Sequence, residues 1–288
     1  MSDPVIIIGA PRSGTNMLRD VLTRLPGFAT WPCDEINFVW RHGNRDVASD
    51  ELKREHATAE VKTFLHRQFD KIGRKYDAHT VVEKTCANSL RVGFVAEAFP
   101  RAKYVFIRRD GIDAAASAMK RWNAPINPSY TAKKTRYVPL SDVGYYGRQF
   151  ISNRVRGRRP TTDGNGSTGV TNWWGPKPND YAHLQAQHPL DEICMLQWQR
   201  CVEATAIGFA ALPEVSVHDL IYEEFVENPA LHLRKILAFL GRSDLMNESA
   251  ISGVSRHSVG KGRGSLGPES VARLEALSHE TLSKFGYV

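Results

Sequence analysis

The spacing of apolar residues near the N-terminus changes abruptly, and the change predicts a strand, a turn and a helix in succession. Residues 5–8 form a β-branched apolar run, too short for a helix and typical of a buried parallel strand. From Thr15 onward, apolar residues recur at intervals of three and four, as on one face of a helix. They are Met17, Leu18, Val21, Leu22 and Leu25. Residues 9–14 must then form a tight turn between the two elements.

Short apolar runs and helical patterns continue to alternate along the chain. Further strands are predicted at residues 28–31, 80–84, 103–107 and 215–222. Helices are predicted over residues 50–74, 88–99, 113–120, 191–211 and 230–240, with a cap at Ser49 or Asp50 for the first of them and Pro268 opening a last helix. This alternation indicates right-handed crossovers. We therefore predict a single domain, residues 1–288, with a three-layer α/β/α fold around a central parallel sheet.

Residues 123–190 interrupt this alternation. They are rich in proline, and they contain a glycine-rich tract at 164–169 and the adjacent Trp173 and Trp174. A long irregular insert in a compact domain is usually a lid or a binding loop, so we predict a substrate site or a lid here. Because aromatic rings suit sugars and other ring-bearing molecules, we expect this tryptophan pair to line a pocket.

Composition narrows the class of ligand. The 288 residues carry a net charge of +7 and a pI near 9.3, which favours an anionic partner such as nucleic acid, a phosphorylated cofactor or an acidic substrate. No nucleic-acid-binding motif is present, no apolar run is long enough to span a membrane, and no leader precedes the first strand. The four scattered cysteines lack metal-site spacing, which indicates free thiols in a reducing compartment, the cytoplasm, and no metal.

The first turn has the geometry of an anion cradle. A strand, a glycine turn and a helix aim backbone N–H groups at one point, and Arg12, Ser13, Thr15 and Asn16 add side-chain donors. The turn has the glycine spacing of a nucleotide triphosphatase loop, but Thr15 stands where that motif needs lysine. We therefore predict a cradle for a different phosphate-like group; the simpler alternative is an ordinary turn whose glycines serve only the reversal of the chain.

Cations also follow two further predicted strands. Lys84 ends one of them, and Arg108 and Arg109 follow another. Ligands of open parallel sheets bind beyond the carboxyl ends of the strands. Three strand ends with cations therefore predict one shared anion site.

Together these motifs resemble the sulfotransferases that use 3'-phosphoadenosine 5'-phosphosulfate. Pro11-Arg12-Ser13-Gly14-Thr15 is similar to the 5'-phosphosulfate loop of that family. Residues 104–117 are similar to its 3'-phosphate motif, in which a serine follows the strand-end arginine by eight residues. This spacing matches Arg109 and Ser117, with Arg108 as the competing assignment.

Three more stretches extend the resemblance. Glu83-Lys84-Thr85 is similar to a strand end of bacterial and Golgi-type members, the residues around Tyr222 resemble the late strand–helix signature, and residues 255–263 resemble the basic loop that closes over the cofactor. The resemblance implies a cofactor-binding set of Arg12, Ser13, Gly14, Thr15, Asn16, Arg109, Ser117, Tyr222, Arg256, Lys261, Gly262 and Arg263.

The resemblance also implies the reaction. A sulfonate group would pass from this cofactor to a hydroxyl of a saccharide or small natural product, without metal, and Arg12, Thr15 and Lys84 would stabilise the leaving phosphate. A kinase with a degenerate loop and a non-catalytic nucleotide- or anion-binding module are the alternative functions. The sequence does not indicate an oligomeric state.

Three residues are candidates for the general base. Glu35 follows the second predicted strand, where Golgi-type members have a catalytic glutamate, and it is our first choice. His42 is second, because histidine is the natural base at neutral pH and the cytosolic branch uses one. Asp34 is third. An alternative interpretation of Glu35 is a first-turn acid that only interacts with a helix dipole.

Overall fold

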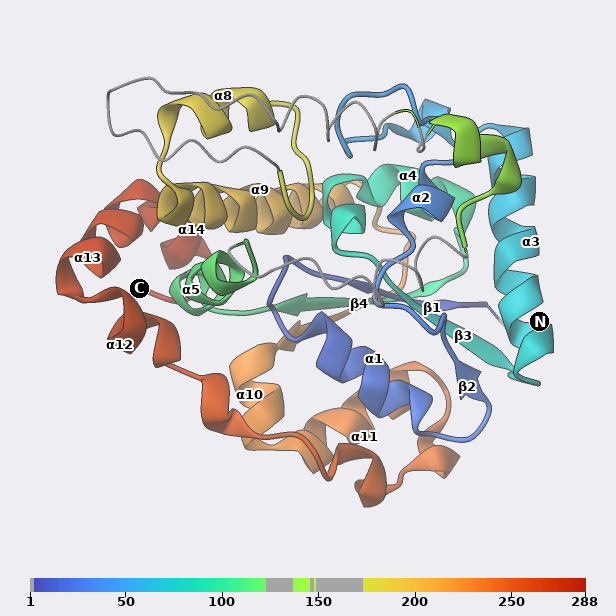
Figure 1. Cartoon of the computed structure of the whole chain (residues 1–288). Coiled ribbons are helices and arrows are strands. Elements are labelled where there is room, and N and C mark those ends of the chain that lie inside the picture. The colour runs from blue at the N-terminus through green and yellow to red at the C-terminus, as the bar shows by residue number, and fades with distance from the viewer. Residues whose placement is uncertain (1–2, 123–136, 146–147, 149–172) are drawn as a thin grey trace.

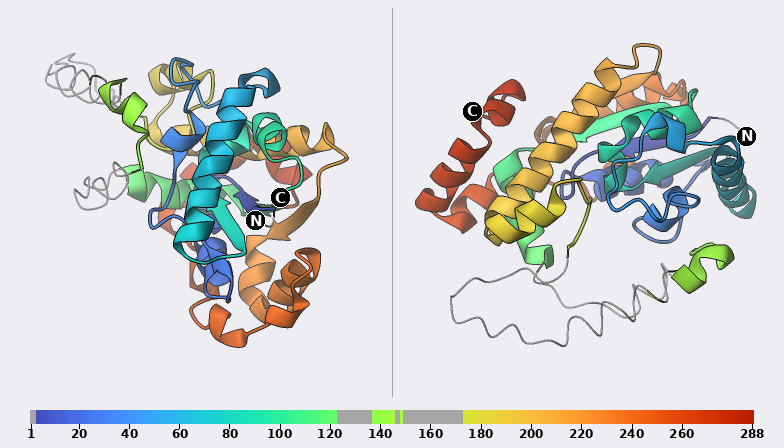
Figure 2. Two further views of the ribbon diagram at one scale, coloured as in Figure 1. Left: turned by 90° about the vertical axis from the view of Figure 1, so that its right-hand side faces the viewer. Right: turned by 90° about the horizontal axis from the view of Figure 1, so that it is seen from above.

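The computed structural model describes residues 3–122, 137–145, 148 and 173–288 (Figure 1). Within these residues five parallel strands form one sheet of order β2-β3-β1-β4-β5, and helices cover both faces (Figure 2). The strands are β1 (Val5–Ile8), β2 (Phe28–Ala29), β3 (Thr80–Lys84), β4 (Lys103–Arg108) and β5 (Val217–Ile221). The predicted α/β/α class is confirmed.

Alternate residues of β1 supply two different cores. Val5 and Ile7 face α1 (Thr15–Thr23), α10 (Tyr222–Glu227) and α11 (Pro229–Phe239), which lie below the sheet in Figure 1. Ile6 and Ile8 face the other layer, which includes α2 (Asn37–Trp40), α3 (Ala59–Lys75) and α4 (Val92–Ala98). A strand buried on both sides explains the uninterrupted apolar run in the sequence.

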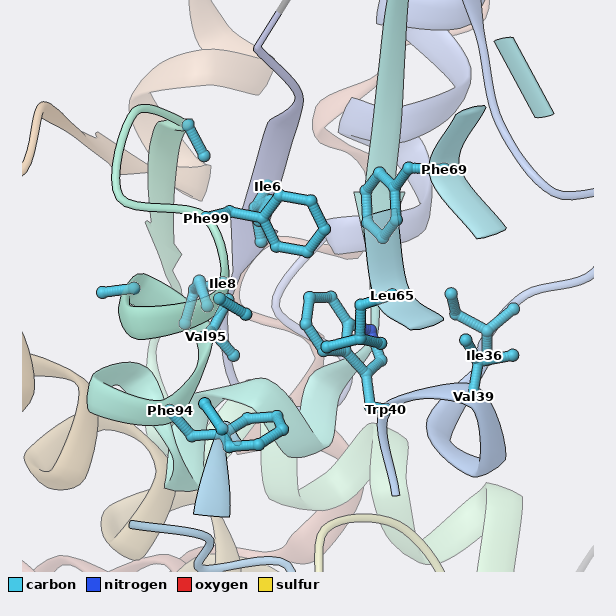
Figure 3. Close-up of a cluster of buried hydrophobic side chains, with 14 of the residues drawn as sticks. Ile6, Ile8, Ile36, Val39, Trp40, Leu65, Phe69, Phe94, Val95 and Phe99 are labelled. Carbon is cyan, nitrogen blue, oxygen red and sulfur yellow. The ribbon is translucent and has the colours of Figure 1, made fainter. Parts of the chain in front are cut away.

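An aromatic cluster fills the upper core. The indole of Trp40 meets the rings of Phe69, Phe94 and Phe99 edge to face, at centroid distances of 5.8, 6.4 and 5.8 Å (Figure 3). A third core lies between α5 (Gly111–Trp122), α9 (Leu190–Ala210), α13 (Pro268–Leu277) and α14 (His279–Lys284). It joins the C-terminal helices to the end of β4, and the helix predicted to open at Pro268 is confirmed.

The predicted cap at Ser49 or Asp50 is wrong. Helix α3 begins at Ala59, and the hydroxyl of Thr58 caps it by accepting from the N–H of Val61. Asp50 is buried instead, and its carboxylate accepts hydrogen bonds from Arg41 and from the N–H of Lys177. These partners lie 9 and 127 residues away, so local sequence does not reveal them.

Short helices occupy several segments without apolar periodicity. Helix α8 (Tyr181–Gln187) lies within the predicted irregular insert, the remainder of which falls largely outside the described residues, and α12 (Lys261–Leu266) lies within the predicted basic loop. The 3-10 turns are Arg54–His56, Cys86–Leu90, Leu140–Asp142, Ser243–Leu245, Glu248–Ile251 and Arg256–Ser258. Among the described helices, none combines the length and the apolar character needed to cross a membrane.

Replacing Trp40 with alanine should destabilise the protein strongly, because the indole is fully buried against three phenylalanines. We expect the free energy of unfolding to fall by about 3–5 kcal/mol in urea denaturation. Tyr76→Ala, at a largely exposed aromatic, is the control and should change it by less than about 0.5 kcal/mol. Equal losses in the two variants would contradict the central role of this cluster.

Candidate active site

A cavity of about 810 Å³ lies beyond the carboxyl ends of β1, β3 and β4. This is the edge at which open parallel sheets bind ligands. Nine of the residues predicted for the site line the cavity: Arg12, Gly14, Thr15, Asn16, Glu35, Lys84, Arg109, Ser117 and Tyr222. The structure thus brings together residues from the three strand ends that the sequence singled out.

Two close approaches explain the glycines of the first loop. A Cβ atom on Gly9 would lie 2.5 Å from the carbonyl oxygen of Ile107, and one on Gly14 would lie 2.4 Å from the ring of Tyr222. Gly14 also has a φ of +86°, in the left-handed region that favours glycine. The loop is therefore seated directly against β4 and the start of α10.

Arg12 adopts a strained conformation in this loop. Its φ is +68°, which is uncommon for any residue other than glycine. The guanidinium of Arg109 donates to its carbonyl oxygen at 3.0 Å, and its own Nε donates to the hydroxyl of Ser117 at 2.9 Å. Burial lowers the pKa of Arg12, and the neighbouring charges of Arg109 and Arg121 lower it further.

The start of α1 offers hydrogen-bond donors to the cavity. The N-cap residue is Gly14, so no side chain satisfies the first N–H groups of the helix. Among the described residues, the buried hydroxyl of Ser13 and the buried Oδ1 of Asn16 have no hydrogen-bond partner. A helix N-terminus beside an unsatisfied hydroxyl fits a phosphate or sulfonate group.

Lys84 and Glu35 form an ion pair in the cavity wall. Nζ of Lys84 lies 3.1 Å from Oε1 of Glu35, which also accepts from the N–H of Cys86 at 3.3 Å. Burial lowers the pKa of Lys84, but the charge and hydrogen bond of Glu35, together with the neighbouring Cys86, raise it by more, so the pKa lies above its ordinary value. The ammonium is therefore charged at neutral pH.

The other two candidate bases have different surroundings. The ring of His42 is absent from the cavity wall; its Nδ1 lies 2.9 Å from Oδ2 of Asp142, and it packs on the ring of Phe64 at 3.8 Å between centroids. Asp34 lines the cavity beside Glu35, but its carboxylate faces the guanidinium of Arg19 at 3.7 Å. Among the hydrogen bonds of the described residues, Lys84 contacts one of the three candidate bases, and this candidate is Glu35.

Arg109 is held in the cavity wall by several contacts. It donates to the carbonyl oxygen of Ser258 at 2.6 Å and to Asp113 at 3.3 Å, and its guanidinium stacks on the ring of Tyr222 at 4.6 Å. Its buried Nε has no partner among the described residues. Ser117 lines the same cavity, but its hydroxyl contacts Arg12 rather than Arg109.

The competing arginine lies elsewhere. Arg108 forms an ion pair with Asp219 at 2.7 Å and also donates to the carbonyl oxygen of Phe285. It is absent from the lining of the cavity. Its position at the end of β4 therefore turns it toward β5 and the C-terminus.

The basic loop contributes less to the cavity than its sequence suggests. Arg263 pairs with Asp110 and Glu275, Arg256 is exposed beside Glu227, and Lys261 is exposed at the start of α12. None of the three lines the cavity. Gly262 also lies outside it, with its N–H bonded to Asp113 at 2.6 Å.

Two residues that the sequence analysis did not single out contact Arg109. Ser258 lines the cavity, and its hydroxyl lies 2.6 Å from the phenolic oxygen of Tyr222. Asp113, 3% exposed, accepts from the N–H groups of Gly260 and Gly262 at 2.7 and 2.6 Å and thereby holds the basic loop on α5. An acid in the first turn of a helix is the available sequence signal, but it indicates only a dipole interaction.

The cavity is also lined by Trp174, Gly175, Pro176 and Arg121. Trp174 was expected here, whereas its neighbour Trp173 packs on Trp122 and Tyr181 and is not part of the lining. In the described ranges no cluster of three or more histidine, cysteine, aspartate or glutamate side chains has metal-site geometry.

One protein family matches the N-terminal part of the chain. The model of the sulfotransferase family matches residues 4–159, which include the loop, Glu35, Lys84, Arg109 and Ser117. No curated protein matches the chain in sequence.

Solved structures share the fold. A sulfotransferase domain from the curacin biosynthetic pathway superposes with a TM-score of 0.53 at 12% identity, over 100% of this chain and 99% of that one. The sulfotransferase STF9 from Mycobacterium avium superposes with a TM-score of 0.51 at 13% identity, over 98% of this chain and 76% of that one. Because the family model spans more than half of the chain and these folds agree with it, the chain belongs to the sulfotransferase family.

Proposed function

We propose that this protein transfers a sulfonate group from 3'-phosphoadenosine 5'-phosphosulfate to a hydroxyl of a saccharide or small natural-product acceptor. The contact between Glu35 and Lys84 beside the first loop, in one cavity, carries this proposal. Sulfonate transfer to a hydroxyl needs a proton acceptor and a positive charge near the leaving phosphate, and this pair supplies both.

The residues of the cavity suit the donor. The N-terminus of α1, with Thr15 and Asn16 in the cavity wall, would hold its phosphosulfate end, and Arg109 with Tyr222 would hold its 3'-phosphate. When bound, the donor supplies the sulfonate and leaves as adenosine 3',5'-bisphosphate. The unpartnered buried Nε of Arg109 supports this assignment, because a buried donor needs an acceptor.

Each catalytic side chain has a separate task. Glu35 accepts the proton of the acceptor hydroxyl as the oxygen attacks. The positive charge of Lys84, together with that of Arg12, stabilises the negative charge that develops on the leaving phosphate. Arg12 stays protonated even though burial lowers its pKa, so it acts through charge and hydrogen bonding.

Adenosine 3',5'-bisphosphate should raise the melting temperature of the protein more than ATP with magnesium or a single-stranded oligonucleotide does. At about 100 times its dissociation constant, the stabilisation corresponds to about 2.7 kcal/mol. Differential scanning fluorimetry measures the shift for all three ligands. Stronger stabilisation by ATP with magnesium would favour the kinase alternative. Stronger stabilisation by the oligonucleotide would favour a non-catalytic module that binds nucleic acid.

Arg109→Lys should weaken the binding of adenosine 3',5'-bisphosphate by about tenfold or more, because lysine keeps the charge but loses the planar fork. Isothermal titration calorimetry measures the affinity. Arg108→Lys is the matched control: the same exchange one residue away, at a side chain that faces Asp219, should leave the affinity within about twofold of wild type. An affinity that falls only in the Arg108 variant would reverse the assignment.

Glu35→Gln should reduce turnover by about 10²- to 10⁴-fold, because the proton acceptor is lost. It should leave the affinity for adenosine 3',5'-bisphosphate nearly unchanged, because Glu35 is not among the residues proposed to hold the bisphosphate. Transfer of labelled sulfonate measures turnover. Asp34→Asn and His42→Gln serve as comparisons, since their side chains face Arg19 and Asp142, and each should retain turnover within about tenfold of wild type. Near-normal turnover in Glu35→Gln would remove Glu35 from the role of base.

A further inference from the structure

We propose that Thr85 and Glu83, two buried residues outside the cavity wall, are positioning residues that hold the proposed base Glu35 in place against Lys84. This inference rests on the proposed function, because it concerns the residue to which that function assigns proton transfer. It adds two residues to the reaction that do not touch the substrate and act through the backbone beside the base.

The segment that carries Glu35 needs support from other parts of the fold. Glu35 lies just before α2, a helix of four residues, and the N-cap residue of this helix, Ile36, makes no side-chain cap hydrogen bond. A single helical turn is not stable by itself in water, because few hydrogen bonds offset the cost of nucleation. Contacts with other elements must therefore fix the backbone at Glu35.

Thr85 provides such a contact at the residue next to the base. Its hydroxyl oxygen accepts from the N–H of Ile36 at 3.2 Å, and its proton is donated to Oε1 of Glu83 at 2.6 Å. A hydroxyl has one proton and two lone pairs, so donation to Glu83 leaves the lone pairs of Thr85 for the N–H. Thr85 is fully buried, and water therefore does not compete for either bond.

Glu83 also reaches the following residue of the segment through a second chain of hydrogen bonds. Its Oε2 accepts from Nδ2 of Asn88 at 3.0 Å, and Oδ1 of Asn88 accepts from Nε of Arg91 at 2.9 Å. Nη2 of Arg91 then donates to Oδ1 of Asn37 at 2.6 Å. One buried carboxyl group thus supports two successive residues of the segment.

The arrangement uses both faces of β3. Successive side chains of a strand point to opposite faces, so Lys84 lines the cavity whereas Glu83 lies on the other side of the sheet. Lys84 contacts the carboxylate of the base, and Glu83 supports the backbone beside it through Thr85. The end of one strand therefore sets both the charge partner and the backbone position of Glu35.

Thr85→Val is the first test, because valine has the shape of threonine without the hydroxyl. Turnover is measured as transfer of labelled sulfonate to methyl glucoside or to 4-methylphenol, whichever probe wild-type protein uses faster. We expect it to fall by about 10- to 100-fold, since a displaced base accepts a proton poorly. The calorimetric affinity for adenosine 3',5'-bisphosphate should stay within about twofold of wild type, because Thr85 does not line the cavity. The calorimetric number of sites corrects turnover for unfolded protein.

Two matched variants accompany this test. Thr85→Ser keeps the hydroxyl and should restore turnover to within about threefold of wild type. Thr281 is also buried, and its hydroxyl donates to the carboxylate of Glu203, but it lies on α14, well apart from α2 in Figure 1. Thr281→Val should lower the melting temperature as Thr85→Val does and leave turnover within about twofold of wild type.

Glu83→Gln tests the part played by Glu83. The oxygen of the new amide can accept from Asn88, and its NH2 group can donate to Thr85, which keeps a lone pair for Ile36. Turnover should therefore remain within about fivefold of wild type. A loss as large as that of Thr85→Val would show that the charge of Glu83 matters rather than its hydrogen bonds, and it would overturn this part of the inference.

Three results would overturn the role of Thr85. They are near-normal turnover in Thr85→Val, equal turnover in Thr85→Val and Thr85→Ser, and a loss of affinity for the bisphosphate that matches the loss of turnover. The third result would mean that the hydroxyl supports the whole site rather than the base.

Failure of the proposed function has a different readout: wild-type protein would not bind the bisphosphate and would transfer no sulfonate. Crystal structures of wild type and Thr85→Val then still decide the inference. The separation between Nζ of Lys84 and Oε1 of Glu35 should grow from 3.1 Å to beyond hydrogen-bond distance, about 3.5 Å, in the variant. An unchanged separation would contradict a positioning role for Thr85.

Discussion

A charged ammonium buried at the end of β3 requires a carboxylate beside it, and this requirement fixes the segment that follows β2. The side chain of Lys84 is only 3% exposed, and an unpaired charge at such a position costs several kcal/mol. Glu35 supplies the partner. Residues after β3 hold the same segment twice more: the hydroxyl of Thr85 accepts from the N–H of Ile36 at 3.2 Å, and the N–H of Cys86 donates to Glu35. The proposed base, Glu35, is thus placed by Lys84 at the end of β3 and by the two residues that follow it.

The same segment is tied to the opposite wall of the cavity through one buried carboxylate. The carboxylate of Asp50 accepts hydrogen bonds from the side chains of Asn37 and Arg41, which follow Glu35 in the chain. It also accepts from the backbone N–H of Lys177, which follows the cavity-lining residues 174–176. The segment that bears Glu35 and the aromatic wall therefore share an anchor. Because breaking a buried network leaves uncompensated charge, these two parts of the cavity wall are held together.

The sequence predicts those parts of the site that depend on local pattern. The first loop follows from a strand, two glycines and a helix that are contiguous in the chain, and the parallel sheet brings Lys84 and Arg109 to the same edge without further information. The sequence does not reveal contacts between distant residues. Arg263 lies outside the cavity, where it forms ion pairs with Asp110 and Glu275. Asp50 does not cap a helix; its carboxylate accepts from the backbone N–H of Lys177, far along the chain. Local propensity does not reveal either contact.

The loop around Arg12 is held by contacts within the protein. The left-handed backbone at Arg12 costs about 1–2 kcal/mol for a residue with a Cβ, and the bond from Arg109 to its carbonyl oxygen helps to hold it. Arg109 is in turn fixed by Ser258 and by Asp113, which also binds the backbone of the basic loop. The first loop, α5 and the basic loop are thereby joined through one guanidinium. Contacts within the protein thus hold the donors around Arg12 and Arg109 in place, and such preorganisation lowers the cost of binding an anion.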